Sequence, residues 1–557
     1  MQAFTRWFQK QSTWIESQQA TILSAAFIIL IANVASAVFG LVKNRVLLSA
    51  YVDMGGLIDS YWVAFRLPEF IFQLIVLGTV SAAFVPLFSK LHKEDQDEAF
   101  GLARQIMLVL LSIFVLSGVV VFFFAPQFIA LLTGPEFTAE QTELAIGLTR
   151  IMLIAQLFFA ISGFMSAMLQ SLKRFIVPAF SPVFYNLGII LFVWLFSEQM
   201  GLYAAAWGTV FGAFLHFVIQ LPLLKKCGFQ LFGGFHWRPG KLKELFLLAG
   251  PRTIAMVIEQ MNLWVVTFLA TSIGGISLTL ITVAQQLMSI PIRFFGVSIA
   301  QASLPFFAAN AHDEVGFRTM VYRSLRQIAF FSIPASTLLL ILRVAIVRLA
   351  YGVEELPWRA TLDTAAVLGI LSISIAAQAC TLLFVRAFYA MNNTVVPFFA
   401  SVTYFLATVI LGWYLVLVQG MGLTGIALSL TIAGLLEMFI LLLIFLIKQR
   451  FHGFGQFSWA MGRIIGASLL MALTLFIFQR LFDLYVFETS RVLQLVVLTL
   501  IVGTLGCVVY VTFCWLLKIE ELTILSRIFH KLRSQWNKVV GNTPDFVESV
   551  SPGEQAS

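Results

Sequence analysis

Long apolar runs, separated by short polar connections, recur along most of the chain. A helix that crosses a bilayer needs about 20 mainly apolar residues, because the hydrocarbon core is about 30 Å thick and the helix rises about 1.5 Å per residue. The pattern therefore predicts an all-α polytopic membrane protein with about fourteen transmembrane helices. The expected spans cover residues 22–48, 58–90, 102–132, 143–170, 176–197, 201–224, 245–273, 277–310, 323–351, 363–390, 395–417, 422–447, 464–482 and 492–517.

The connections between these runs fall into two sets that differ in charge. Alternate connections hold most of the lysines and arginines, whereas the others contain little beyond Arg359, Arg480 and Arg491. Basic connections stay on the cytoplasmic side of a membrane, so we expect both termini in the cytoplasm. The basic set comprises Arg6, Lys10, Lys90, Lys93, Lys173, Arg174, Lys225, Lys226, Lys241, Lys243, Arg318, Arg323, Lys448 and Arg450.

The second half of the apolar pattern repeats the first. The second and eighth spans are both interrupted, and Pro86 and Pro305 close them at an offset of 219 residues. Pro178 and Pro397 are separated by the same offset. Six spans per copy is an even number, so the copies should have the same orientation and be related by an axis along the membrane normal. Two broken spans in corresponding positions predict a transporter site between the halves.

The duplication predicts two parallel six-helix repeats followed by an accessory helix pair. Downstream of that pair, apolar residues recur every three or four positions opposite basic ones, which is typical of an amphipathic helix on an anionic membrane surface or against cytoplasmic loops. The predicted organisation is a cytoplasmic segment 1–21, an N-lobe 22–226, a linker 227–244, a C-lobe 245–449, a linker 450–463, the accessory pair 464–518, the amphipathic helix 519–540 and a disordered tail 541–557.

Composition supports this class and excludes others. The chain is 60% hydrophobic and 11% charged, which excludes an ordinary soluble protein. A net charge of +8 is compatible with nucleic acid, but the positive residues lie in the connections, so no nucleic-acid partner is expected. The sequence contains no P-loop, HExxH, GxSxG or paired metal-ligand spacing, which predicts a protein that is not an enzyme and has no cofactor or metal. Transport would then depend on an ion gradient, the membrane potential or the substrate gradient.

Few ionisable residues fall within the predicted spans, where each costs about 2.5–3.5 kcal/mol at the bilayer centre and usually faces a partner or a wet cavity. Glu259 lies about 22 Å along its helix, near the midplane, and is the coupling or proton-binding candidate. The candidate substrate-binding residues are Lys43, Arg45, Asp59, Arg66 and Arg293.

Each of these residues also has a structural interpretation. Lys43 and Arg45 could extend to the outer headgroups, and Glu259 could be a protonated, hydrogen-bonded structural group. Arg66 and Glu69 lie three residues apart on one helical face and could pair. Two further alternatives are that Arg293 satisfies carbonyls freed by Pro291, and that the buried polar groups His216 and Glu437 serve packing.

Motifs spread over the first twelve spans form one combined pattern. They are Ser36 to Lys43, Asp59 with Val63-Ala64-Phe65-Arg66-Leu67-Pro68, Gly78, Ala83-Phe84-Val85-Pro86, Gly296-Val297-Ser298-Ile299-Ala300, Leu304-Pro305, and Arg386-Ala387-Phe388-Tyr389-Ala390 followed by Pro397. Together they resemble the lipid II flippase family MurJ, also called MviN, within the multidrug/oligosaccharidyl-lipid/polysaccharide exporter superfamily.

The resemblance implies a flippase of the bacterial cytoplasmic (inner) membrane. It would move an undecaprenyl-pyrophosphate-linked peptidoglycan precursor from the inner to the outer leaflet by alternating access, with membrane lipids and possible cell-wall synthesis proteins as partners. The alternatives are a polysaccharide-repeat flippase, a cation-coupled small-molecule antiporter of the same superfamily, or a non-transporting membrane scaffold.

The sequence departs from the family at positions that would carry charge. The arginine expected after Ser36 is Ala37, the second-span arginine pair is Phe72 and Gln73, and the glutamate before Gly78 is Leu77. In the eighth span the family arginine and nearby glutamate are Gln286 and Ser289. Either Lys43, Arg45, Arg66 and Arg293 supply positive charge from shifted positions, or the cargo is less anionic, or transport has been lost.

Arg66→Ala and Arg293→Ala should each abolish binding of a pyrophosphoryl lipid, because a pyrophosphate in a low-dielectric cavity requires cationic hydrogen-bond donors. Binding is measured with a labelled pyrophosphoryl lipid and purified protein. Unchanged binding by both variants would remove the electrostatic basis of the substrate hypothesis.

Overall fold

The computed structural model describes residues 22–77, 84–230, 233, 239–310, 312–352, 356–485 and 492–523, and every regular element in them is helical. The predicted all-α class is therefore confirmed. The segment 1–21, most of the predicted helix 519–540 and the tail 541–557 lie outside the described residues.

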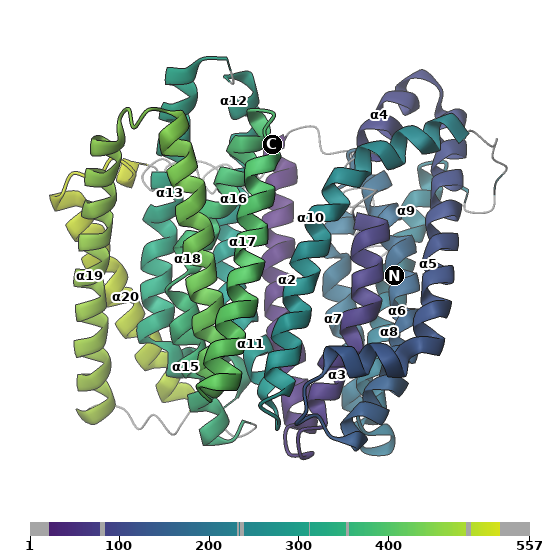
Figure 1. Cartoon of the computed structure of the whole chain (residues 1–557), viewed down its shortest axis with the longest axis horizontal. Coiled ribbons are helices and arrows are strands. Elements are labelled where there is room, and N and C mark those ends of the chain that lie inside the picture. Colours follow the sequence, from purple (N-terminus) through teal and green to yellow (C-terminus); the bar gives the residue numbers. More distant parts are fainter. Residues whose placement is uncertain are drawn as a thin grey trace, which may run out of the picture.

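The N-lobe and the C-lobe are each built from helices that run back and forth across one slab (Figure 1). The N-lobe contains α2 (Ile22–Tyr51), α3 (Ile58–Phe72), η1 (Gln73–Leu77), α4 (Val85–Glu94), α5 (Gln96–Leu132), α6 (Ala139–Ser171), α7 (Ile176–Met200), α8 (Tyr203–Val218) and α9 (Leu221–Lys226). The C-lobe contains α10 (Pro239–Thr271), α11 (Ser277–Pro291), η3 (Ile292–Val297), α12 (Ser298–Ala309), α13 (Glu314–Ile341), α14 (Arg343–Tyr351), α15 (Trp358–Ser372), α16 (Ile375–Ala390), α17 (Val395–Gly412), η4 (Trp413–Val418) and α18 (Gly422–Lys448).

The helices agree with the predicted spans. Within the described residues, eleven helices are long and apolar enough to cross a membrane, and twelve if α15 and α16, bent by 45°, form one span. The remaining two predicted spans correspond to α10 and to α3 with η1 and α4. Most helices extend a few residues beyond the apolar runs, because polar residues cap them. Asp95 accepts a hydrogen bond from the backbone of Glu98, and Thr138 forms a capping box with Gln141.

The interruptions of the second and eighth spans fall at equivalent places in the repeat. A π-helical segment begins at Gln73 in the N-lobe and at Ile292 in the C-lobe, again 219 residues apart. A π segment shifts the hydrogen-bond register and often marks a functional part of a helix. The predicted pair of broken spans is therefore present in the folded chain.

Two ends of the slab need names. The Asp59 end is where α3 and α11 begin. The basic end is opposite, near α4 and α12 in Figure 1. The connections at the basic end carry Lys90, Lys93, Lys173, Arg174, Lys225, Lys226, Arg318, Lys448 and Arg450.

The accessory pair, α19 (Phe454–Tyr485) and α20 (Val492–Leu516), lies at the outer edge of the C-lobe in Figure 1. It packs on α13, where the Tyr510 hydroxyl donates a hydrogen bond of 2.7 Å to the Phe330 carbonyl. Near the basic end, Arg463 of α19 donates to the carbonyls of Leu517 and Lys518 at 2.9 and 3.4 Å. A cation at these last carbonyls also complements the helix dipole.

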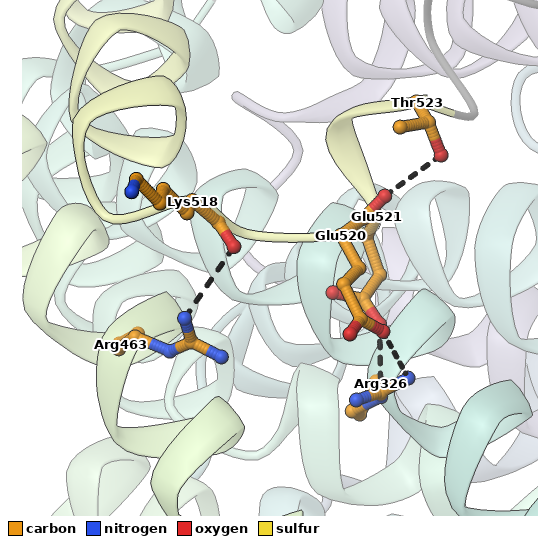
Figure 2. Close-up of polar contacts among 6 residues, drawn as sticks. All are labelled: Arg326, Arg463, Lys518, Glu520, Glu521 and Thr523. Carbon is orange, nitrogen blue, oxygen red and sulfur yellow. Dashed lines mark hydrogen bonds and ion pairs between the residues drawn. The ribbon is translucent and has the colours of Figure 1, made fainter.

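Arg326 of α13 fixes the turn that follows α20 (Figure 2). Its guanidinium forms ion pairs with Glu520 at 3.0 Å and Glu521 at 2.9 Å. The Glu521 side chain is only 4% exposed, whereas that of Glu520 is 73% exposed. The pair with Glu521 therefore holds the accessory helices to the C-lobe more strongly than the pair with Glu520.

Replacing Arg326 with alanine should lower the free energy of unfolding by about 1–3 kcal/mol, because the buried Glu521 carboxylate loses its charged partner. Glu520→Ala is the matched control and should have little effect, because exposed ion pairs contribute about 0–1 kcal/mol. The measurement is thermal unfolding in detergent. A loss of stability in Glu520→Ala equal to that in Arg326→Ala would contradict this account.

Candidate functional site between the two lobes

Asp59, at the start of α3, joins the N-lobe to the C-lobe. Its carboxylate accepts hydrogen bonds from the backbone N–H groups of Leu278 and Thr279 at 2.9 and 2.8 Å. The Thr279 hydroxyl donates a third, at 2.5 Å. These are unpaired donors of the first turn of α11, where the helix dipole favours a negative charge. Asp59 is 1% exposed, so its charge is compensated by another lobe's helix terminus.

Glycines allow the two lobes to approach closely beside Asp59. Gly56 and Gly275 occupy equivalent repeat positions, have φ angles of 89° and 63°, and face each other across the lobe boundary. A Cβ atom on Gly56 would lie 2.7 Å from the Gly275 carbonyl oxygen. Gly134 makes a similar approach, and its backbone N–H donates to Thr271 at 2.8 Å. Larger residues at these turns would separate the lobes.

Two more polar contacts join the lobes within the spans. Arg66 Nε of α3 donates to Thr267 Oγ1 of α10 at 2.9 Å. Asn44 of α2 donates through its side-chain amide to Gln286 of α11. Gln286 is one of the positions where the sequence departs from the family arginine, so the neutral residue here takes part in lobe-to-lobe contact.

The structure brings Lys43 and Arg66 together around one acid. Both cations lie within electrostatic reach of Glu69. Each is eight residues from the helix terminus at the Asp59 end, which places both about 12 Å from that end. Lys43, Arg45 and Arg66 are all half-buried. Lys43 and Arg66 therefore form a basic pair flanking Glu69 near the lobe boundary.

Arg293 does not belong to this group. It lies in η3 with an exposed side chain, sixteen residues beyond the start of α11 and so about 24 Å from the Asp59 end. The carbonyl of Arg293 accepts a hydrogen bond from Ser298 Oγ at 3.3 Å. The predicted substrate-binding residues thus occupy two depths in the protein.

Glu259 lies near a second acid that the sequence reading treated as packing. Tyr404 of α17 is within electrostatic reach of both Glu259 of α10 and Glu437 of α18. Glu437 accepts a hydrogen bond of 3.2 Å from Ser401 and is half-buried, whereas Glu259 is exposed. Two carboxylates around one phenol, within the spans of one lobe, form an arrangement that can hold a cation or a proton.

The N-lobe carries different chemistry at the equivalent positions. Tyr185 is the counterpart of Tyr404 at an offset of 219, and His216 is the counterpart of Glu437 at an offset of 221. His216 is hydrogen-bonded through Nδ1 to Ser162 Oγ at 2.8 Å. Lys43 is the counterpart of Asn262. The fold is duplicated, but the basic groups lie in one lobe and the acidic pair in the other.

The other departures from the family pattern are also accommodated. Phe72 packs against Phe159 with ring centroids 6.1 Å apart, and the Gln73 amide donates to Glu69 at 3.4 Å. Sequence reasoning missed the Tyr404–Glu437 neighbourhood and the contact between Asn44 and Gln286. The repeat offset was a usable signal for the first, since it aligns Tyr185 with Tyr404, but nothing in the sequence links Asn44 to Gln286.

Two six-helix lobes in parallel orientation, broken second and eighth spans, and polar contacts at one end of the lobe boundary define a polytopic membrane protein of the transporter class. The model of the lipid II flippase MurJ family matches residues 48–497. The chain therefore belongs to that family.

Curated relatives agree over most of their length. "Lipid II flippase MurJ" of Burkholderia cenocepacia is 25% identical over 453 residues, covering 78% of this chain and 86% of the relative. "Probable lipid II flippase MurJ" of Bdellovibrio bacteriovorus is 25% identical over 532 residues, covering 93% and 99%.

Solved structures show the same fold. "Lipid II flippase MurJ, inward closed conformation" superposes with a TM-score of 0.70 at 21% identity, covering 87% of this chain and 98% of that one. An inward-facing MATE family multidrug transporter superposes with a TM-score of 0.62 at 14% identity, covering 74% and 94%.

Asp59→Asn should shift the lobes toward a conformation open at the Asp59 end, because an amide cannot replace a carboxylate that accepts three hydrogen bonds at a helix N-terminus. A loss of about 1–3 kcal/mol corresponds to roughly a five- to hundredfold change in the closed-to-open ratio. The measurement is the distance between spin labels at Glu140 and Met421, which are exposed on opposite lobes at this end.

Gly56→Ala should open the same end by steric separation of the two backbones. Asp363→Asn, which neutralises an exposed carboxylate of α15 near the same end, is the matched control and should leave the distance unchanged. A short distance retained in both Asp59→Asn and Gly56→Ala would show that these contacts do not hold the lobes together.

Proposed function

We propose that this protein is a transporter, not an enzyme, that flips a lipid-linked peptidoglycan precursor across the cytoplasmic membrane by alternating access. The family match over residues 48–497 carries the proposal. The two-lobe architecture supports it, because lobes joined at one end can rock about a site between them. The proposed cargo is an undecaprenyl-pyrophosphate-linked precursor, as the names of the relatives imply.

The orientation follows from charge. With the basic end in the cytoplasm, both termini are cytoplasmic and the Asp59 end faces outward. The Asp59 contacts then close the outer side of the boundary, so the cargo would enter from the inner leaflet. Cell-wall synthesis proteins are proposed partners at the membrane surfaces, with membrane lipids around the spans.

Lys43 and Arg66 are the proposed pyrophosphate-binding residues, with Arg45 close in sequence and Arg293 deeper along the path. Glu69 holds the first two cations near each other without substrate, and an incoming pyrophosphate would compete with it for them. The neutral residues Phe72, Gln73 and Gln286 do not supply charge. Under this proposal the shifted cations replace the family arginines.

Asp59 has a different proposed role from the binding role expected from the sequence. Its carboxylate oxygens are engaged by α11, so it acts as a latch between the lobes and not as a direct substrate ligand. Opening the Asp59 end would expose both the carboxylate and the N-terminus of α11 to water.

The proximity of Glu259 to Tyr404 and Glu437 favours cation or proton coupling as the driving mechanism. This cluster lies within the C-lobe, so a bound cation would change the internal packing of α10, α17 and α18 and not the lobe boundary directly. The same observation is what favours the alternative function, a cation-coupled antiporter of the same superfamily.

Conditional complementation tests the function. The protein should restore growth to a strain depleted of its lipid II flippase, and proteoliposomes should move a labelled undecaprenyl-pyrophosphate precursor between leaflets. Glu259→Gln should reduce that movement at least about tenfold if a cation must bind the cluster. Glu198→Gln, an exposed acid of α7, is the matched control.

Failure of complementation at normal expression would favour the alternatives. Export of a small substrate that stops when the ion gradient is dissipated would identify an antiporter. Loss of cellular function on truncation after Lys518, without any effect of Lys43→Ala or Arg66→Ala, would identify a scaffold.

A further inference from the structure

A cavity of about 300 Å³ lies where the end of α5 meets α10 and α17, at the Asp59 end of the lobe boundary. All of its lining side chains are apolar or aromatic and none is charged. Two belong to the N-lobe and nine to the C-lobe. They are Leu131, Leu132, Met261, Trp264, Val265, Phe268, Leu269, Phe405, Val409, Trp413 and Leu417.

The cavity is continuous with the surface that faces the lipid. Leu131 is 69% exposed, Trp413 is 56% exposed, and Phe268 is 37% exposed, so their outer faces lie on the surface of the slab. A pocket walled by aromatic and aliphatic groups, with no polar anchor, excludes a phosphate or sugar headgroup. Its occupant must be hydrocarbon.

The depth of the cavity identifies the kind of hydrocarbon. Its deepest residue on α10, Met261, is ten residues from the end of that helix, or about 15 Å. Phe405 is thirteen residues from the end of η4, or about 20 Å. These depths match one leaflet, since the whole hydrocarbon core is about 30 Å thick. The volume is at the lower end of the roughly 300–1,000 Å³ found for ligand sites, which suits a single chain.

We propose that this cavity binds one acyl chain of a membrane phospholipid from the leaflet at the Asp59 end, and that the bound chain favours the conformation closed at that end. The second part follows from the origin of the walls. Leu131 and Leu132 move with the N-lobe and the other walls with the C-lobe, so the complete pocket exists only while the lobes meet. A ligand that binds one conformation more tightly shifts the population toward it.

Photolabelling tests the binding site. The full chain is reconstituted in vesicles of phosphatidylethanolamine and phosphatidylglycerol, with a photoreactive group in one acyl chain, and adducts are mapped by mass spectrometry. Adducts should concentrate on residues 261–269 and 405–417. An even distribution over the exposed faces of α19 and α20 as well would overturn the proposal.

Leu131→Trp fills the mouth of the cavity and should reduce these adducts at least about fivefold, because added volume in an occupied pocket is costly. Leu116→Trp is the matched control, since Leu116 lies on the same helix, is 68% exposed and does not line the cavity. Folding should survive in both variants, because both side chains are largely exposed. Equal adduct yields in the two variants would overturn the proposal.

The same variants test the conformational part. Spin labels at Glu140 and Met421 should report a larger open fraction in Leu131→Trp than in Leu116→Trp, in the same phospholipid vesicles. Equal open fractions would overturn the effect on conformation. A polyprenyl phosphate with the same photoreactive group provides the last comparison. If it labels the cavity more strongly than the phospholipid, the occupant is the tail of a polyprenyl lipid and the assignment to a membrane phospholipid is wrong.

Discussion

The buried carboxylate of Asp59, at the N-terminus of α11, is the contact on which the arrangement of the lobes depends. A buried carboxylate requires donors, and the first turn of a helix has N–H groups without intrahelical partners. Each need is met by the other only while the lobes touch. When they separate, both groups must be hydrated. The contact therefore favours two well-defined conformations, one closed and one open to water, over a continuous range between them.

The repeat explains where this contact forms, and its sequence explains why the contact is one-sided. Gly56 and Gly275 are equivalent and meet at the lobe boundary, as expected for two similar units related by an axis. Asp59 itself is equivalent to Leu278, so only α11 receives a carboxylate from the opposite lobe. A duplicated scaffold has thus acquired different chemistry in its two copies, with Lys43 and Arg66 in one lobe and Glu259 and Glu437 in the other.

The accessory pair and the apolar cavity place the membrane in contact with both lobes. Arg326, Arg463 and Tyr510 attach α19 and α20 to α13, so these helices extend the C-lobe and should move with it. The cavity lies across the lobe boundary, where Leu131 and Leu132 meet α10 and α17. Under the two proposals, the lipid around the protein is a component of the mechanism and not only its solvent.

The sequence by itself determined the helical class, the order of the spans and the duplication, because apolar runs of fixed length and a constant offset of 219 residues are local properties of the chain. It also identified the few charges within the spans, since each is costly in hydrocarbon. Only the tertiary structure decided what those charges do. Asp59 meets backbone donors 219 residues away, Asn44 meets Gln286 across 242 residues, and Glu259 shares Tyr404 with Glu437. Such partners lie on other helices, and the rotation of one helix against another is set by packing over its whole length, which no local pattern of residues encodes.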